Sequence, residues 1–407
     1  MKQEEFSKIL ISSFPFETTS GQRILFTKLS EFILNKNADQ IFVLKGYAGT
    51  GKTTIVRSLV QSLPAVNGKT VLLAPTGRAA KVLSNYTGKQ AYTIHMLFIG
   101  DTAQLPPVGL DVSPALDIEF LKASFYFQID WYELTEVVRQ SEASGILTNA
   151  TFIRDQIKNS SGSKPHFQVN SFKDIIRLGG DELEDALNST YSKYGAEETM
   201  VICRSNKRAN IFNQQIRARI RWQENELSAG DYMMVVKNNY FWLPEESKAG
   251  FIANGDIIEL MSIGKIQEMH GFRFADVRMR LIDYPDEPEL ETRLILDTIM
   301  SEAPALSQQD NKRLYESVSM DYNDIPDKRL RLKKVKEDGF FNALQVKFAY
   351  AVTCHKAQGG QWPCVFVEQG YLTDEMINTE YLRWLYTAVS RASEKLYLVN
   401  FNKDFFE

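Results

Sequence analysis

The chain has 407 residues, which predicts two to four domains, because a single hydrophobic core rarely grows that large. A hydrophobic fraction of 44% and a charged fraction of 24% are typical of soluble globular proteins, and the short apolar runs exclude a membrane-spanning protein. The net charge of −4 excludes a protein that coats nucleic acid through overall positive charge, and leaves open either a local groove or no contact with nucleic acid.

The first residues and the cysteines indicate in which cell compartment the protein is expected. The first residues, MKQEE, are acidic and no apolar core follows them, so we expect no secretory signal. The three cysteines, Cys203, Cys354 and Cys364, lie far from any zinc-ligand spacing and are expected to be reduced thiols. Both features predict a cytoplasmic protein.

The first third of the chain alternates short apolar strands with helices. Thr18, Thr19 or Ser20 is a candidate cap for a first helix, in which apolar residues recur at helical spacing as far as Ile33. Strands are predicted at 41–45, 70–74 and 97–99, with helices from about Lys52 and about Arg78. This alternation is typical of a parallel α/β sheet.

A similar unit restarts in the second half, so we predict two α/β lobes. Its elements are a strand at 200–203, a helix at 206–220 and strands at 348–352, 365–368 and 396–401. A small inserted β-barrel is predicted from strand-like runs at 233–236, 257–261 and 277–282 and a hairpin-type turn at 254–256. The polar residues 302–338 predict a helical excursion from the barrel, or else a solvated surface arm without function.

These elements divide the chain into three predicted domains. Lobe 1 takes residues 1–140, lobe 2 takes 141–227 and 344–407, and the barrel takes 228–343 with its excursion at 302–338. The predicted fold class is therefore α/β, with two parallel sheets and an inserted barrel.

A phosphate-binding loop follows the first predicted strand. Residues 46–53, GYAGTGKT, fit the pattern G-x-x-x-x-G-K-[ST] in the strand–loop–helix context that this pattern requires. The glycines let backbone N–H groups face phosphates, and the helix N-terminus adds positive potential. Lys52 would bridge the β- and γ-phosphates, and the Thr53 hydroxyl would ligate Mg²⁺. An ordinary glycine turn explains neither residue, so ATP and Mg²⁺ are the predicted cofactors, although kinases, GTPases and motors all share this loop.

Further segments resemble the signature motifs of superfamily 1 helicases, in the family's order. They are APTGRAA at 74–80, TIH at 93–95, GDTAQLPPVG at 100–109, LTEVVRQ at 134–140, TCHKAQGGQ at 353–361 and YTAVSRA at 386–392. The chain resembles the RecD-like and Dda-like branch most. That resemblance implies two RecA-like lobes, ATP hydrolysis and movement along single-stranded DNA.

The resemblance also assigns roles at the nucleotide. Gln104 would contact the γ-phosphate or the attacking water, and Arg139 and Arg391 would be arginine fingers; for either arginine alone, a salt bridge is the alternative. Gln22 resembles an adenine-reading glutamine, and an exposed polar residue fits it nearly as well. The remaining predicted nucleotide contacts are Gly46, Ala48, Gly49, Thr50, Gly51, Lys52, Thr53, Thr54, Gln358, Gly359 and Gln361, the last at a position where the family often has Glu.

Two groups of residues would grip nucleic acid from opposite lobes, in the manner of an inchworm. Lobe 1 would contribute Pro75, Thr76, Arg78, Thr93 and His95. Lobe 2 would contribute Asn206, Thr353, His355 and Lys356. Such side chains hold phosphates without reading sequence. For either histidine taken alone, a packed polar role is the alternative.

One expected element is missing. P-loop motors carry an Asp-Glu pair at the end of another strand, and the family places it, with a strand-separating pin, between the segments at 93–95 and 100–109. Here Met96 alone separates His95 from Leu97, and the pairs at 181–182, 286–287 and 374–375 do not close an apolar strand of lobe 1. Either several dozen residues belong after His95 and are missing from the sequence, or the chain lacks them. We favour a missing segment, because a sheet without its central strand would fold poorly.

The predicted activity is Mg²⁺-dependent ATP hydrolysis that single-stranded DNA stimulates and that drives translocation and unwinding at single-strand/duplex junctions. The branch implies 5′-to-3′ movement, a monomeric motor and a role in DNA repair, recombination or replication. Two alternatives stay open: a nucleotide-dependent clamp on nucleic acid or protein that does not hydrolyse ATP, and an RNA helicase.

Overall fold

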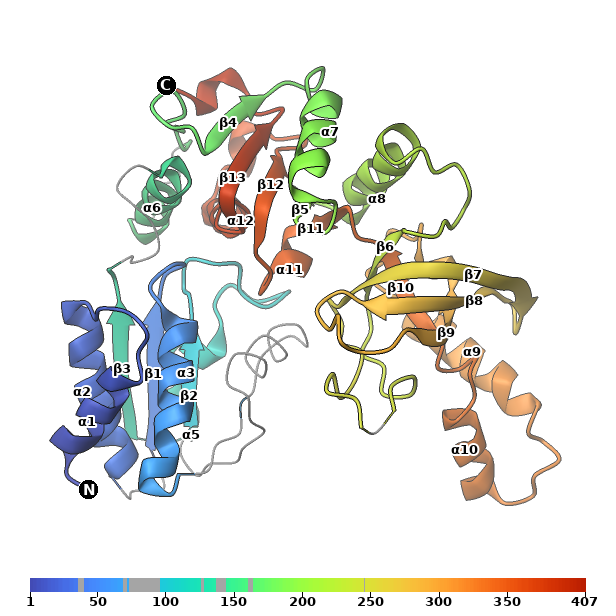
Figure 1. The fold of residues 1–407 in the computed structure, drawn as a ribbon, viewed down its shortest axis with the longest axis horizontal. Helices are drawn as coiled ribbons and strands as arrows, with labels where there is room; N and C mark the ends of the chain where they lie inside the picture. Colours follow the sequence, from blue (N-terminus) through green and yellow to red (C-terminus); the bar gives the residue numbers. More distant parts are fainter. Residues whose placement is uncertain are drawn as a thin grey trace.

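The computed structural model describes residues 1–35, 40–68, 72, 96–125, 128–136, 144–159, 164–244 and 246–407. These residues form two α/β lobes and a closed β-barrel that carries a pair of helices (Figure 1). The predicted class, parallel α/β lobes with an inserted barrel, is confirmed. No helix within these ranges is long and apolar enough to span a membrane.

Lobe 1 is built on a three-stranded parallel sheet in the order β2-β1-β3. Its strands are β1 (Gln40–Gly46), β2 (Met96–Gly100) and β3 (Gln128–Leu134). Its helices are α1 (Gln3–Ser12), α2 (Ser20–Leu34), α3 (Lys52–Ser62) and α5 (Ile118–Phe125), with 3₁₀ turns η1 (Leu63–Val66) and η2 (Pro114–Leu116). The strand predicted at 70–74, apart from residue 72, and the helix predicted from about residue 78 lie outside the described residues.

The helix that the sequence predicts as the first in the chain is the second, α2. Thr19 caps α2: its hydroxyl accepts from the N–H of Gln22, and the Gln22 amide oxygen accepts from the N–H of Thr19. Helix α1 precedes it and packs against α2 and α3, with Phe6 and Leu10 fully buried. Neither α1 nor the strand β3 is predicted from the sequence.

The strands β1 and β2 differ in how deeply their side chains are buried. In β1, which lies between the other strands, Ile41, Phe42 and Val43 are at most 1% exposed. In β2, residues 97–99 are only partly buried although all three are apolar. Within the described ranges β2 pairs with β1 alone, so its outer edge has no described strand partner.

Lobe 2 has five parallel strands in the order β11-β5-β12-β13-β4. They are β4 (Ile175–Leu178), β5 (Thr199–Cys203), β11 (Ala351–Thr353), β12 (Trp362–Glu368) and β13 (Ala392–Val399). The helices are α6 (Gly145–Lys158), α7 (Leu183–Tyr194), α8 (Asn206–Gln215), α11 (Cys354–Ala357) and α12 (Thr379–Val389), with a π-helical turn η3 (Ile216–Ile220) after α8 and 3₁₀ turns η5 (Asp374–Met376) and η6 (Lys403–Phe405).

Alternate side chains of β5 point to opposite faces of this sheet. Met200 and Ile202 join the core cluster that contains residues of α6 and α12. Val201 and Cys203 join the cluster that contains residues of α7 and α8. Helices α6 and α12 therefore cover one face of lobe 2, and α7 and α8 cover the other (Figure 1).

The barrel closes in the order β10-β6-β7-β8-β9. Its strands are β6 (Tyr232–Val235), β7 (Ile257–Met269), β8 (Phe272–Leu281), β9 (Leu290–Ile295) and β10 (Leu344–Phe348), followed after β9 by a 3₁₀ turn η4 (Leu296–Thr298). The predicted excursion is helical, with α9 (Gln308–Met320) and α10 (Lys328–Lys336), and it is anchored by Val318 and Val335, both fully buried.

Residues 348–352, predicted as one strand, belong to two domains. Strand β10 ends at Phe348 in the barrel, and β11 begins at Ala351 in lobe 2. The N–H of Ala349 donates to Tyr232 in the barrel, whereas the carbonyl of Tyr350 accepts from Val201 in lobe 2. The chain thus crosses between domains within two residues, and the barrel extends past the predicted boundary at residue 343.

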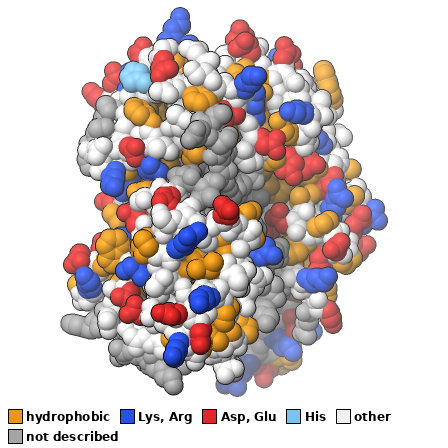
Figure 2. Space-filling model, turned by 60° about the vertical axis from the view of Figure 1, so that its left-hand side comes forward, with side chains coloured by type: hydrophobic (Ala, Val, Ile, Leu, Met, Phe, Trp, Pro, Cys, Tyr) orange, Lys and Arg blue, Asp and Glu red, His pale blue; other side chains and the backbone are white. Residues whose placement is uncertain are grey.

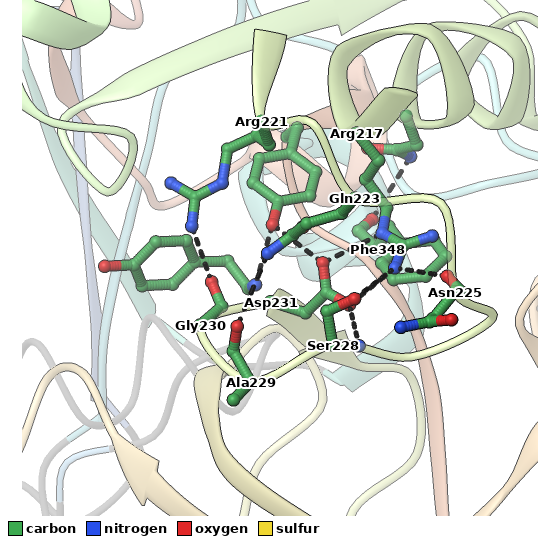
Figure 3. A network of polar contacts seen from close by, with 12 residues as sticks. Arg217, Arg221, Gln223, Asn225, Ser228, Ala229, Gly230, Asp231 and Phe348 are labelled. Atoms are coloured by element: carbon green, nitrogen blue, oxygen red, sulfur yellow. Dashed lines mark hydrogen bonds and ion pairs between the residues drawn. The ribbon is translucent and has the colours of Figure 1, made fainter. Parts of the chain in front are cut away.

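A buried ion pair joins the barrel to lobe 2 (Figure 3). Arg217 of η3 and Asp231, just before β6, form two parallel bonds, from Nε to Oδ1 at 2.8 Å and from Nη2 to Oδ2 at 2.9 Å. The Tyr350 hydroxyl donates to Oδ1 at 3.0 Å, and the N–H of Ser228 donates to Oδ2 at 2.8 Å. The Arg217 guanidinium also lies 4.3 Å from the ring centre of Phe348. The fully buried carboxylate is therefore satisfied by both domains.

Replacing Asp231 with Asn should destabilise the protein by about 3–5 kcal/mol, because it leaves the Arg217 charge buried without its counter-ion. Urea unfolding measures the loss. The control is Glu226→Gln, which removes an exposed pair with Arg273 at 2.7 Å and should cost less than about 1 kcal/mol. Equal losses in the two variants would contradict the idea that the buried pair joins the domains.

Candidate nucleotide and nucleic-acid site

The P-loop occupies the turn from β1 to α3, as predicted. Gly49 and Gly51 have φ of 80° and 87°, a left-handed conformation that side chains other than glycine rarely adopt. Gly51 is the N-cap of α3, so the first-turn N–H groups of the helix open onto the loop. Thr53 is exposed on that first turn and Thr54 is partly exposed, which leaves the Thr53 hydroxyl accessible to a cation.

Lys52 turns back onto the loop that precedes it. Its ammonium group donates to the carbonyls of Gly46 and Tyr47 at 2.5 and 2.7 Å. The Thr50 hydroxyl also donates to the Tyr47 carbonyl, at 2.9 Å. A phosphate group that binds the loop would compete with these carbonyls for the lysine.

Gln22, predicted to read adenine, is 1% exposed and already bonded at both ends of its amide. Its oxygen accepts from Thr19, and its nitrogen donates to the carbonyl of Thr50 at 3.3 Å. The residue therefore links the cap of α2 to the P-loop. Its contact with adenine stays a prediction.

The Asp101 carboxylate, at the carboxyl end of β2, gathers donors from both lobes. The N–H of Ala103 donates to Oδ1 at 3.0 Å, and the Gln104 amide donates to Oδ2 at 2.9 Å. The hydroxyl of Tyr386, from α12 of lobe 2, donates to Oδ2 at 3.1 Å. The same hydroxyl accepts from the N–H of Ala48 in the P-loop at 3.0 Å. One tyrosine thus bridges the P-loop and the predicted γ-phosphate segment.

Two further bonds tie the segment 100–109 to lobe 2. The N–H of Leu105 donates to the Thr387 hydroxyl at 2.9 Å, and the Gln358 amide donates to the Leu105 carbonyl at 2.8 Å. Burial, and secondarily the nearby Asp101, raise the pKa of Tyr386 well above its ordinary value. The Tyr386 hydroxyl therefore stays protonated at neutral pH and remains able to donate to Asp101.

Of the two predicted arginine fingers, only Arg391 lies within the described residues. Arg391 is 7% exposed and donates to the carbonyls of Thr387 and Gly360 and to the Ser390 hydroxyl, at 3.0–3.1 Å. All three bonds stay within lobe 2. Its role at the γ-phosphate stays a prediction, and Arg139 lies outside the described residues.

An arginine that the motifs did not single out lies beside the P-loop. The guanidinium carbon of Arg154, from α6, is 4.3 Å from the ring centre of Tyr47. Arg154 lines a cavity between the P-loop and lobe 2 that also includes the predicted ribose contact Gln361. The other lining residues are Ala48, Gly49, Ile146, Leu147, Ala150, Thr151, Tyr386, Ser390, Ala392 and Ser393. No spacing signal marks Arg154, because it is one cation on an amphipathic helix.

The lobe 2 residues predicted to grip nucleic acid lie at one edge of its sheet. Thr353 ends β11 opposite Cys203, which ends the adjacent β5, and Asn206 begins the helix that follows β5. Lys356 lies on α11, directly after β11, where burial lowers the pKa of its ammonium to about 8. His355, on the same turn, is exposed, whereas the Asn206 amide donates to the Glu302 carbonyl.

The partner grip in lobe 1 is not described. Pro75, Thr76, Arg78, Thr93 and His95 all lie outside the described residues, so these assignments stay predictions. Figure 2 shows basic and acidic side chains interspersed over one face of the molecule. Because the described basic residues on that face are mixed with acidic ones, contact with nucleic acid there would need a local groove, since they form no broad basic surface.

Comparison with known proteins agrees with these features. Residues 348–399 match the family of the UvrD-like helicase C-terminal domain, and residues 27–98 match an AAA domain. The ATP-dependent DNA helicase dda of Enterobacteria phage T4 is 37% identical over 82 residues, which cover 20% of this chain and 18% of that protein. The predicted resemblance to superfamily 1 helicases is confirmed. The predicted class, an ATP-hydrolysing helicase, is confirmed at this level.

Other relatives of this helicase extend along most of the chain. The uncharacterized protein R530 of Acanthamoeba polyphaga mimivirus is 21% identical over 491 residues, covering 92% of this chain and 98% of that protein. Among solved structures, Pif1 helicase from Candida albicans is 15% identical with a TM-score of 0.43, and covers 96% of each chain. Pif1 helicase from Bacteroides, solved with ADP-AlF3 and single-stranded DNA, is 14% identical with a TM-score of 0.44, and covers 96% of this chain and 95% of that chain.

Replacing Tyr386 with Phe should strengthen ADP binding to the helicase roughly fivefold. The hydroxyl occupies the Ala48 N–H that a phosphate would use, and one such hydrogen bond is worth about 1 kcal/mol. Titration with a fluorescent ADP analogue measures the change. Tyr381→Phe, on the same helix, is the matched control and should leave the affinity unchanged. Weaker ADP binding in Tyr386→Phe would show that the hydroxyl supports the nucleotide rather than competing with it.

Proposed function

We propose that this helicase uses ATP hydrolysis to move along single-stranded DNA and to open the duplex at single-strand/duplex junctions. The observation that carries the proposal is the bridge from Ala48 through Tyr386 to Asp101. This bridge makes the contact between the lobes depend on the same groups that face the phosphates. A change in nucleotide state then changes how the lobes meet.

The nucleotide would be held mainly by lobe 1. Lys52 would exchange its carbonyl partners for phosphate oxygens, and Gln104 would turn from Asp101 towards the γ-phosphate or the attacking water. Mg²⁺ would neutralise phosphate charge, and it usually keeps several waters and takes few protein ligands. The Thr53 hydroxyl fits that role, because it is exposed at the start of α3.

The DNA would be held at the carboxyl edge of the lobe 2 sheet. Thr353, Asn206 and Lys356 offer a hydroxyl, an amide and an ammonium group there, which suits contact with phosphates irrespective of sequence. Burial lowers the pKa of Lys356 to about 8, and a nearby DNA phosphate would raise this pKa again, because an anion favours the charged ammonium. We further propose 5′-to-3′ movement as a monomeric cytoplasmic motor in DNA repair, recombination or replication.

The missing Asp-Glu pair favours one alternative, a clamp that binds ATP without hydrolysing it. The pairs at 181–182 and 374–375 lie in lobe 2 and the pair at 286–287 lies in the barrel. None of them stands at a strand end of lobe 1. An RNA helicase is the other alternative, because the described grip does not discriminate the 2′-hydroxyl.

We also propose that a segment belongs after His95 in the working motor. In the part of the chain that the structure describes, β2 has no strand at its outer edge, and its side chains at 97–99 are only partly buried, as expected if a neighbouring strand were removed. The alignment with the mimivirus protein runs over 491 residues, more than the 407 of this chain, so that relative carries sequence without a counterpart here. Such a segment would carry the Asp-Glu pair and the pin.

Single-stranded DNA should stimulate ATP hydrolysis by this protein, and Lys52→Ala should abolish the stimulated rate, because the lysine ammonium is the charge that would hold the phosphates. Phosphate release in the presence of Mg²⁺, with and without an oligonucleotide, measures both effects. The control is Lys158→Ala, at the exposed end of α6. ATP binding without any DNA-dependent turnover would favour the clamp.

The intact mass of the protein isolated from its natural source should exceed the 46.5 kDa of this chain by several kilodaltons. Mass spectrometry of the whole protein, followed by peptide mapping across residues 90–100, locates the additional residues. A mass of 46.5 kDa with one continuous peptide through His95 and Met96 would rule out the missing segment. The clamp would then be the better description.

A further inference from the structure

We propose that Arg154 contacts the phosphates of the bound nucleotide from lobe 2. The inference deepens the proposed function and rests on its nucleotide site. It starts from the cavity between the two lobes, where Ala48 and Gly49 of the P-loop face Thr151 and Arg154 of α6. Backbone N–H groups on one wall and a guanidinium on the other are the donor types that proteins use to hold phosphate oxygens.

The position of Arg154 is fixed by packing on both sides. Helix α6 is attached to lobe 2 through Ile146, Ala150 and Ile153, which are 3%, 6% and 1% exposed. On the opposite side the guanidinium stacks on Tyr47 of the P-loop at 4.3 Å. A charge carried by lobe 2 is thus held against the loop of lobe 1, and it would move with lobe 2 when the lobes separate.

The Arg154 guanidinium is only loosely engaged elsewhere. Its Nε and Nη2 both lie 3.3 Å from one oxygen of Asp155, the adjacent residue, which is 56% exposed. Long bonds to one exposed oxygen contribute little and are easily replaced. Because a guanidinium has five N–H donors, Arg154 keeps donors for a phosphate. The Arg154 side chain is 14% exposed, so such a contact would be shielded from water.

Arg391 differs from Arg154 in this respect. To reach a phosphate, Arg391 would have to leave three bonds of 3.0–3.1 Å within lobe 2. Two of them hold backbone carbonyls, one in its own motif (Thr387) and one in the segment 353–361 (Gly360). Arg154 would exchange only the weak bonds to Asp155. Among the described arginines, Arg154 is therefore the one that we assign to the phosphates across the lobe interface.

Arg154→Gln should weaken the binding of a fluorescently labelled ATP analogue by roughly 10- to 100-fold, which is the range for a hydrogen bond to a charged group. Fluorescence titration in the presence of Mg²⁺ measures the affinity. Arg154→Lys keeps the charge but loses the planar fork, so it should recover part of the affinity. Lys158→Gln, one turn further along α6 and exposed, is the matched charge control and should bind like the unaltered protein.

Two further variants separate the possible failures. Tyr47→Leu removes the stacking partner but leaves the arginine, so a loss that equals that of Arg154→Gln would mean that Arg154 only supports the P-loop, which would overturn the proposal. Lys52→Ala tests the nucleotide site itself. If Lys52→Ala loses binding and Arg154→Gln does not, Arg154 is not a phosphate ligand. If neither variant loses binding, the nucleotide site of the proposed function fails as well.

Discussion

The hydrogen bonds around Asp101 are the constraint on which the lobe arrangement depends. The carboxylate stands at the end of β2, next to the P-loop strand, and accepts from Gln104 of its own lobe and from Tyr386 of the other. Tyr386 in turn accepts from Ala48. Nucleotide chemistry and lobe contact therefore use the same few donors, and neither can change without the other.

That coupling reaches the predicted DNA edge because α12, which carries Tyr386, contacts α11 of the same lobe. Lobe 2 is in turn joined to the barrel at several points. The Arg217–Asp231 pair fixes the barrel beneath η3. Asn206 of α8 donates to the carbonyl of Glu302 at 3.0 Å, and Asn210 of the same helix donates to the carbonyl of Met300 at 3.1 Å. A shift of α12 at the P-loop would therefore carry with it the sheet edge that holds Thr353 and Lys356.

The sequence predicted those parts of the site that depend on local backbone shape. The shape of the P-loop is fixed by glycines that need positive φ and by its position between a strand and a helix. A pattern of eight residues is therefore sufficient to predict it from the sequence. Arg154 and the hydroxyl of Tyr386 were not assigned, because their partners lie more than 100 residues away and only the fold brings them together. The single strand predicted at 348–352 was wrong for a similar reason: an apolar run does not reveal that its two halves pair with different domains.

The arrangement of Asp101 also bears on the missing Asp-Glu pair. A residue that polarises the attacking water needs an oxygen free to accept a proton, yet Ala103, Gln104 and Tyr386 all donate to Asp101. While the lobes keep this contact, Asp101 is committed to structure and is poorly suited to replace the missing glutamate. A strand added beside β2 would bring its own carboxylates to the same sheet edge, on the side where residues 97–99 are only partly buried. The physical case for a working motor therefore depends on that added strand, whereas Asp101 and Tyr386 account for the contact between the lobes with or without it.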